Sequence, residues 1–134
     1  MDNYYDDQTG EWVTSQSRYD SVLAEPRFDA IRDHDIQQWP SDRAWALILE
    51  LLAAVPEDTV SYVGSGPLED FVRRHAVEFI SKLEAELPRN PRLQSAALEM
   101  YLTRGDLPSS IEARLAAALG PRFSFLDSSA NHAD

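Results

Sequence analysis

The chain has 134 residues, with 23 acidic and 12 basic side chains and a formal net charge of −11 at pH 7. It contains no cysteine, which excludes disulfides, thiolate metal sites and a cysteine nucleophile. A surface this negative repels nucleic-acid phosphates and anionic lipids, so we expect neither nucleic acid nor a membrane among its partners.

The length fits one domain. No run of the sequence approaches the roughly 20 apolar residues that a membrane-spanning helix needs. The first residues, MDNYYDDQTGEW, are acidic and polar, unlike a signal peptide. These features predict a cytoplasmic location.

Residues 1–25 are predicted to form an acidic arm that is partly irregular. Tyr4, Tyr5 and Trp12 flank the polar run DDQTG, which could be the turn of a small hairpin. The preferred interpretation is a flexible arm whose aromatic side chains dock elsewhere. Acidity is concentrated here, because residues 1–40 hold nine acidic residues and only three arginines.

Residues 26–126 are predicted to be an all-α domain, a compact bundle of five to six short helices. A first helix is expected over Pro26–Trp39. Pro40-Ser41-Asp42 is a start signal for a second helix, Ser41–Val55, which is apolar nearly all round and is therefore predicted to be the central helix of the core.

Pro56 opens a short helix that is expected to end at Val63. Gly64 is predicted to take the left-handed conformation that ends a helix, and Pro67 to occupy the first position of the next one. That helix, from Pro67 to about Leu87, carries the clearest apolar stripe, at spacings of three and four. The stripe consists of Leu68, Phe71, Val72, His75, Ala76, Phe79, Ile80, Leu83 and Leu87.

The C-terminal third is predicted to contain two further helices. The first runs from about Pro91 to Thr103, and the second, Ser109–Leu119, begins with the capping box SSIE. Phe123 and Phe125 are expected to fold back onto the core, together with Leu126. Residues 127–134 are predicted to be a disordered tail.

The sequence contains only weak candidates for catalytic or ligand-binding motifs. The Gly64-Ser65-Gly66 loop lacks the lysine and third glycine of nucleotide-binding signatures, so a helix connector is favoured over a phosphate site. In the run RDHD, the imidazole of His34 and its neighbouring carboxylates point about 100° apart on a helix and do not converge. His75 lies on the apolar stripe, where a core or boundary role is favoured over that of a base. We therefore predict no catalytic, cofactor-binding or metal-binding residues, and no cofactor.

The N-terminal aromatic residues are the one functional signal in the sequence. Tyrosine and tryptophan are typical anchors of protein interfaces, and acids around them favour a basic partner. Packing of the same rings on the protein's own core is an equally good interpretation. The candidate partner-binding residues are Tyr4, Tyr5, Asp6, Asp7, Glu11, Trp12, Asp29 and Asp33.

The run Arg43–Leu98 resembles a small all-helical bacterial domain family of unknown function. The resemblance rests on a tryptophan-led, leucine-rich helix followed by a GxGPLED motif. The matching positions are Trp45, Pro56, Gly64, Gly66, Pro67, Leu68, Glu69, Asp70, His75, Glu84, Glu86, Pro91 and Arg92. The resemblance extends over about residues 41–120 and implies an all-helical fold, but no reaction and no catalytic residue.

The function expected from these patterns is a non-enzymatic, acidic protein-binding domain, such as an immunity protein or antitoxin that caps a basic toxin. The alternative is a structural or accessory subunit that assembles through apolar helix faces. An enzyme that uses carboxylates with His75 ranks third. The sequence does not determine the oligomeric state.

Overall fold

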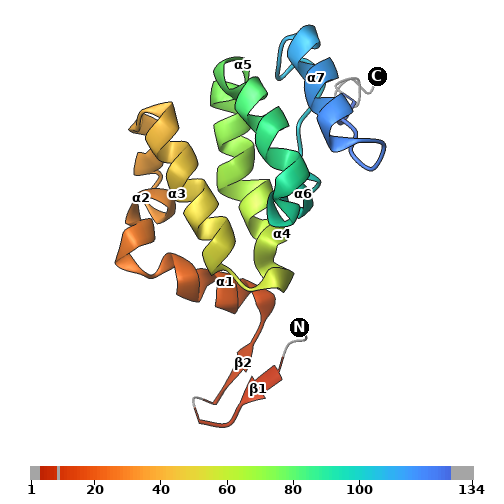
Figure 1. Ribbon diagram of the computed structural model, residues 1–134. Helices are drawn as coiled ribbons and strands as arrows, with labels where there is room; N and C mark the ends of the chain where they lie inside the picture. The colour runs from red at the N-terminus through yellow and green to blue at the C-terminus, as the bar shows by residue number, and fades with distance from the viewer. Residues whose placement is uncertain (1–3, 9, 128–134) are drawn as a thin grey trace, which may run out of the picture.

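The computed structural model describes residues 4–8 and 10–127 (Figure 1). A short β-hairpin precedes a compact body of helices and projects from one end of it, while the last helix, α7, lies at the other end (Figure 1). The body contains seven α-helical segments within these residues. They are α1 (Ser15–Leu23), α2 (Asp29–Arg32), α3 (Ser41–Ala54), α4 (Val60–Val63), α5 (Glu69–Glu86), α6 (Pro91–Ala97) and α7 (Ser109–Leu119).

The predicted all-α fold class is confirmed. The turn Gly64–Leu68 joins α4 to α5 across a kink at Gly66, whose backbone is non-helical with φ of −119° and ψ of −107°; α4 and α5 are counted together as one kinked unit. Counted in this way, the described residues contain six separate helices, in agreement with the expected five to six. None of the helices in this part of the chain is long and apolar enough to cross a bilayer.

Helix α3 is the centre of the core, as its sequence predicts. Its buried side chains are Ala44, Trp45, Leu47, Ile48, Leu51 and Leu52. Trp45 stacks on Phe71 of α5, with ring centroids 5.4 Å apart, and lies 5.8 Å from Phe79 on the same helix. The apolar stripe of α5 therefore covers α3, as expected.

Arg92 of α6 forms hydrogen bonds with the C-terminal end of α3. Its Nε donates a hydrogen bond of 2.6 Å to the carbonyl oxygen of Leu52, and its Nη2 donates to the carbonyl oxygen of Val55. The last carbonyl groups of a helix lack partners within the helix, so a charged donor from another helix stabilises this end.

The N-terminal arm is more regular than predicted. The strands β1 (Tyr4–Asp6) and β2 (Glu11–Val13) form an antiparallel hairpin, which was the less favoured alternative. Helix α1 follows, and the reciprocal hydrogen bonds between Thr14 and Ser17 cap its first turn. The arm that was predicted to be partly irregular therefore contains a hairpin of β1 and β2 and a helix, Ser15–Leu23. The local signals for this structure are the aromatic and β-branched residues of YYD and EWV on either side of a polar turn, and the capping box in TSQS.

Gly64 does not end a helix, and this prediction is wrong. Its backbone is right-handed helical, with φ of −63°. A Cβ atom at this position would lie 1.8 Å from the carbonyl oxygen of Ala96, in α6. Glycine is therefore required by the close approach of two helices. The helical path breaks two residues later, at Gly66 with φ of −119° and ψ of −107°, so Pro67 follows this kink at the start of the next helix, as predicted.

Two predicted helices are shorter than expected. The first, Pro26–Trp39, is divided into a 3₁₀ turn, α2 and a second 3₁₀ turn, because His34 has a left-handed backbone with φ of 65°. The second ends at Ala97 instead of Thr103. Beyond it the chain is irregular, with Met100 and Leu102 buried and Tyr101 exposed between them. That alternation is typical of extended chain, not of a helix.

The expected capping box of α7 does not form. Pro108 precedes the helix and makes no side-chain cap, while Glu112 accepts a hydrogen bond of 2.7 Å from the backbone N–H of Gly105 instead. Phe123 and Phe125 are buried, as predicted, whereas Leu126 is 48% exposed. The predicted disordered tail, 127–134, lies outside the described residues except for Asp127.

Candidate functional site

The hairpin carries the most exposed aromatic pair among the described residues. Tyr5 lies opposite Trp12 in the antiparallel register, so both side chains lie on one face of the hairpin. The rings meet edge to face, with centroids 5.6 Å apart and planes at 71°. Tyr5 is 49% exposed and Trp12 is 65% exposed. The pair is therefore a preformed apolar knob and does not dock on the core.

The acidic candidates of the arm lie close to Tyr5 and Trp12 in the sequence. Asp6 and Glu11 are paired in register at the end of the two strands, Tyr4 is paired with Val13, and Asp7 is exposed in the turn. Gly10 completes the turn with φ of +74°, a conformation that glycine adopts without strain. The structure thus brings six of the eight predicted partner-binding residues into one small hairpin.

The other two candidates, Asp29 and Asp33, lie elsewhere. Asp29 begins α2 and Asp33 follows its end, and α2 is separated from the hairpin by α1 (Figure 1). Both carboxylates interact with Arg32, at 2.6 Å from Asp29 and 3.5 Å from Asp33. The hydrogen bond that Arg32 donates to the carboxylate of Asp29 raises the pKa of the guanidinium. These two carboxylates therefore form local ion pairs with Arg32. The predicted partner-binding residues lie in two separate places, the hairpin and α2.

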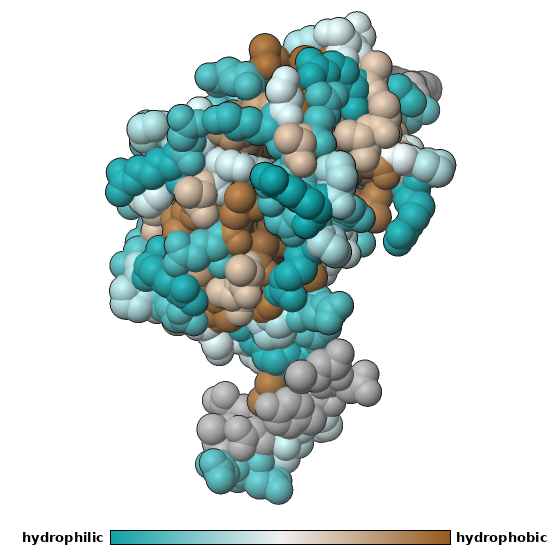
Figure 2. Space-filling view, in the orientation of Figure 1, coloured by the Kyte–Doolittle hydropathy of each residue, from teal (hydrophilic) through white to brown (hydrophobic). Residues whose placement is uncertain are grey.

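Ion pairs of this kind cover the helical body. Arg27 pairs with Glu25 and Glu50, Lys82 with Asp42, and Arg114 with Glu84. Figure 2 accordingly shows a largely hydrophilic face on which hydrophobic residues appear in patches between the helices. Several basic side chains of the body are thus engaged by its own acids.

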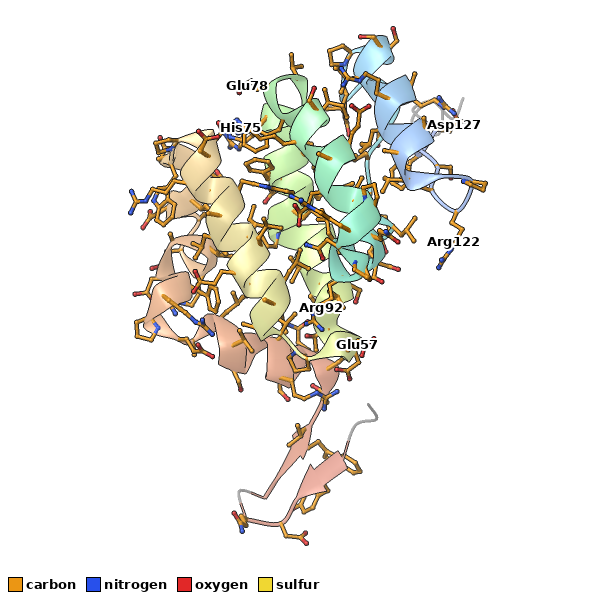
Figure 3. The ribbon with its side chains drawn as sticks, in the orientation of Figure 1. Glu57, His75, Glu78, Arg92, Arg122 and Asp127 are labelled. Atoms are coloured by element: carbon orange, nitrogen blue, oxygen red, sulfur yellow. The ribbon has the colours of Figure 1, made fainter. Side chains whose placement is uncertain are left out.

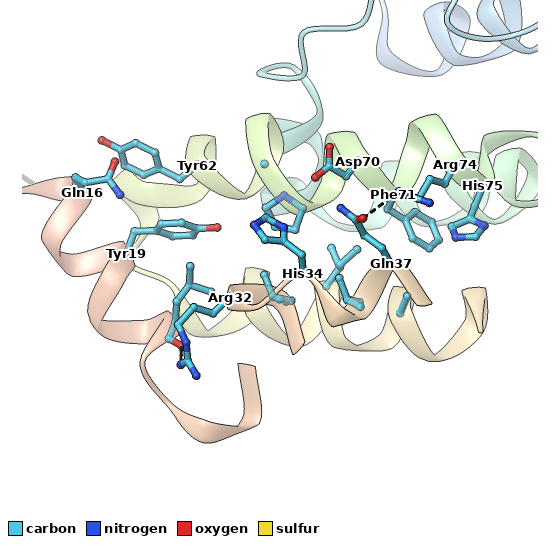
Figure 4. Close-up of a pocket in the computed structure, with 17 residues that line it drawn as sticks. Gln16, Tyr19, Arg32, His34, Gln37, Tyr62, Asp70, Phe71, Arg74 and His75 are labelled. Carbon is cyan, nitrogen blue, oxygen red and sulfur yellow. Dashed lines mark hydrogen bonds between the residues drawn. The ribbon is translucent and has the colours of Figure 1, made fainter. Parts of the chain in front are cut away.

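A second feature, which sequence reasoning missed, is a pocket of about 380 Å³ between α1, the segment from α2 to Gln38, α3 and the start of α5. Its lining includes Leu23, Ile31, Ile36, Ala44, Ile48 and Phe71 as apolar side chains. Figure 4 shows His34, Gln37 and Asp70 around its middle, with Tyr19 and Tyr62 at one end and Phe71 and His75 at the other. No pattern in the sequence indicated the space between these residues.

The polar groups of the pocket are held in definite positions. Arg74 donates a hydrogen bond of 3.0 Å to the side-chain oxygen of Gln37. Burial, together with the neighbouring charge of Asp20, raises the pKa of Tyr19 to about 12, so its phenol is protonated and can donate. His75 packs on Phe71 with ring centroids 4.9 Å apart, which is consistent with the predicted boundary role.

The geometry offers little for metal chemistry in the residues that the structure describes. No group of three or more histidine, aspartate or glutamate side chains there could hold an ion together. The Nδ1 atom of His75 lies 3.3 Å from Oε1 of Glu78. Figure 3 shows this pair toward one end of the helical body and Glu57 and Arg92 toward the other. A single imidazole–carboxylate pair is a common surface contact and does not define a reaction.

Comparison with known proteins identifies a family but no activity. The model of a family of unknown function, DUF6869, matches residues 26–120. No curated protein and no solved structure gives a significant match to the chain. The matched region contains most of the pocket lining and excludes the hairpin and α1.

Proposed function

The chain belongs to DUF6869, a family of unknown function, and we propose from its surfaces that it is a non-enzymatic protein-binding domain. The hairpin is the binding element and the partner presents a basic groove. The observation that carries the proposal is the exposed, edge-to-face pair of Tyr5 and Trp12 at the projecting end of an acidic protein.

The aromatic pair can supply a large share of a binding free energy. Tyrosine and tryptophan bury about 150–250 Å² each, so the exposed fractions of 49% and 65% leave roughly 250 Å² of ring surface to bury. At about 25 cal/mol per Å², this corresponds to at most about 6 kcal/mol before the costs of association. The knob is therefore large enough to act as a hot spot.

The hairpin also has a physical reason to bind. A lone two-stranded hairpin is marginally stable in water, and both of its edges carry unpaired backbone groups. A groove that covers the aromatic face, or a strand that pairs with an edge, would supply the missing contacts. The position of the hairpin outside the family-matched region fits an element that selects a particular partner.

Charge determines the class of partner. A net charge of −11 attracts a cationic protein and accelerates its encounter. A basic enzyme that acts on nucleic acid has such a surface, and an immunity protein or antitoxin that caps a toxin of this kind is our finer proposal. Binding would occlude the cationic cleft with the hairpin and its acids.

The test compares partner capture from the source cells at low salt by three tagged proteins. These are the wild type, Trp12→Ala, and a triple variant in which Asp6, Asp7 and Glu11 become amides. A true partner is a basic protein whose capture is lost with Trp12→Ala and reduced with the triple variant. With the purified pair, Trp12→Ala should weaken binding at least about 30-fold, and the association rate of the wild type should fall steeply with salt.

Tyr101→Ala is the matched control, because Tyr101 is also an exposed aromatic residue, at 58%, but lies in the loop after α6. Its substitution should leave binding unchanged. Assembly through apolar helix faces predicts the opposite pattern, with loss on substitution of the exposed Val77 of α5 and none at Trp12. The apolar stripe of α5 is buried in the chain's own core, which weakens that alternative. A salt-independent association rate would remove the electrostatic part of the proposal.

A further inference from the structure

The pocket between α1, α3 and α5 suits a small molecule, and we propose that it binds an organic amine: an apolar, ring-sized body that carries a protonated amino group held by Asp70. Its volume of about 380 Å³ lies within the range of ligand sites in proteins. This proposal is independent of the hairpin and concerns a different surface.

The apolar part of the site would hold the body of the ligand. Aliphatic side chains from α2, the following turn and α3 form one wall, and Phe71 of α5 closes one end. Tyr19 and Tyr62 stack on each other at the other end, with ring centroids 5.3 Å apart. Flat aromatic faces beside aliphatic side chains favour a planar apolar ring, and they also attract a cation.

The lining holds two arginines and one aspartate, and of these Asp70 is the one without an ion-pair or hydrogen-bond partner among the described residues, so it is the group open to a cationic ligand. Arg32 is engaged by Asp29 and Asp33, and Figure 4 shows its guanidinium turned away from the other lining side chains. Arg74 is engaged by Gln37. Asp70 is the one carboxylate of the lining, and among the residues that the structure describes it has no basic side chain within ion-pairing distance.

An anion would meet two obstacles in the same place. It would have to displace Gln37 from Arg74, and it would lie near the carboxylate of Asp70. The field of a protein with a net charge of −11 opposes its entry and favours the entry of a cation. The phenol of Tyr19, the imidazole of His34 and the amide nitrogen of Gln37 remain as hydrogen-bonding groups beside Asp70 (Figure 4).

Three probes that share one ring system separate the contributions: tryptamine, indole and indole-3-acetate. Tryptamine has roughly a dozen non-hydrogen atoms, so a dissociation constant of about 1 mM or lower is expected by calorimetry. Indole should bind at least about tenfold more weakly, because it lacks the ion pair, and indole-3-acetate more weakly still. Amide NMR shifts should concentrate in residues 16–23 and 66–75.

The variant Asp70→Asn should weaken tryptamine binding about tenfold and leave indole binding unchanged. Glu57→Gln makes the same change in net charge at an exposed site outside the lining, and should leave both unchanged. Thermal unfolding of each variant checks that the fold is intact. The proposal is overturned if tryptamine causes no saturable shifts at millimolar concentration, if indole-3-acetate binds as tightly as tryptamine, or if Asp70→Asn has no effect.

Discussion

Gly64 lies where α4 and α6 approach so closely that no side chain fits, and the substitution Gly64→Ala tests this packing directly. The added Cβ would lie 1.8 Å from the carbonyl oxygen of Ala96 and 2.7 Å from its carbonyl carbon. Ordinary contact for a Cβ begins at about 3.4 Å, so the two helices would have to separate by about 1.6 Å at this point. The obstacle is backbone, which cannot turn aside as a flexible side chain can.

Two opposing effects determine the size and sign of the change. In a free helix, alanine is favoured over glycine by about 1 kcal/mol. Overpacking a close contact costs about 1–3 kcal/mol and occasionally more. The neighbouring Val63 and Leu93 are fully buried, so a shift of the helices disturbs tight packing. Because the obstacle is backbone and the overlap is deep, we expect an overpacking cost above the usual range, about 3–5 kcal/mol. After the gain of about 1 kcal/mol from alanine, the net loss in the free energy of unfolding is roughly 2–4 kcal/mol, or about 10 °C in Tm.

Urea denaturation followed by circular dichroism measures this change. Ser65→Ala is the control in the same π-helical turn: it removes one exposed hydrogen bond to the carbonyl oxygen of Ser61 and should cost less than about 1 kcal/mol. The double variant Gly64→Ala/Ala96→Gly should show no rescue, since the contact at residue 96 is with backbone. A Gly64→Ala protein as stable as the wild type would refute the close approach of α4 and α6.

Three further predictions concern buried polar groups. Glu69→Gln should lower the free energy of unfolding by about 2–3 kcal/mol in urea titrations, because its carboxylate accepts from the Tyr101 N–H and pairs with Arg73. Arg92→Met should lower it by a similar amount, since the last carbonyl groups of α3 lose their donor. Tyr19 has its pKa raised from 10.0 to about 12, so stability should fall as the pH rises from about 10 to 12, by at most about 3 kcal/mol, and level off above. Urea midpoints across this range should show a smaller fall in Tyr19→Phe.

The long periodic helices could be predicted from the sequence because their physics is local. Helix α3 is apolar on nearly every side and α5 has a continuous stripe at spacings of three and four, so both patterns specify helix and buried face together. Where local and tertiary effects compete, the sequence misled. Gly64 looked like a helix end, because glycine favours ends, yet its role is to admit the backbone of α6.

The site was only partly predictable, for a related reason. The aromatic residues Tyr5 and Trp12 could be identified as candidate anchors from their type and acidic surroundings, and the polar run DDQTG between them indicated a hairpin as one alternative. Asp29 and Asp33 were grouped with them by charge alone, but Arg32 between them in the chain engages both. A pocket has no signature of its own in sequence, because it forms where side chains of four separate segments fail to fill the space between them.

The hairpin and the pocket lie on different elements, so the two proposals can fail separately. Trp12 is in β2, before α1, while Asp70 is in the first turn of α5. Trp12→Ala should therefore abolish partner capture and leave the tryptamine affinity within about twofold of the wild type. Asp70→Asn should do the reverse. If instead either variant impaired both activities while remaining folded, α1 would have to couple them, because it begins directly after the hairpin and supplies Tyr19 and Leu23 to the pocket. Binding in one place would then influence binding in the other, and treating the two surfaces as independent would be wrong.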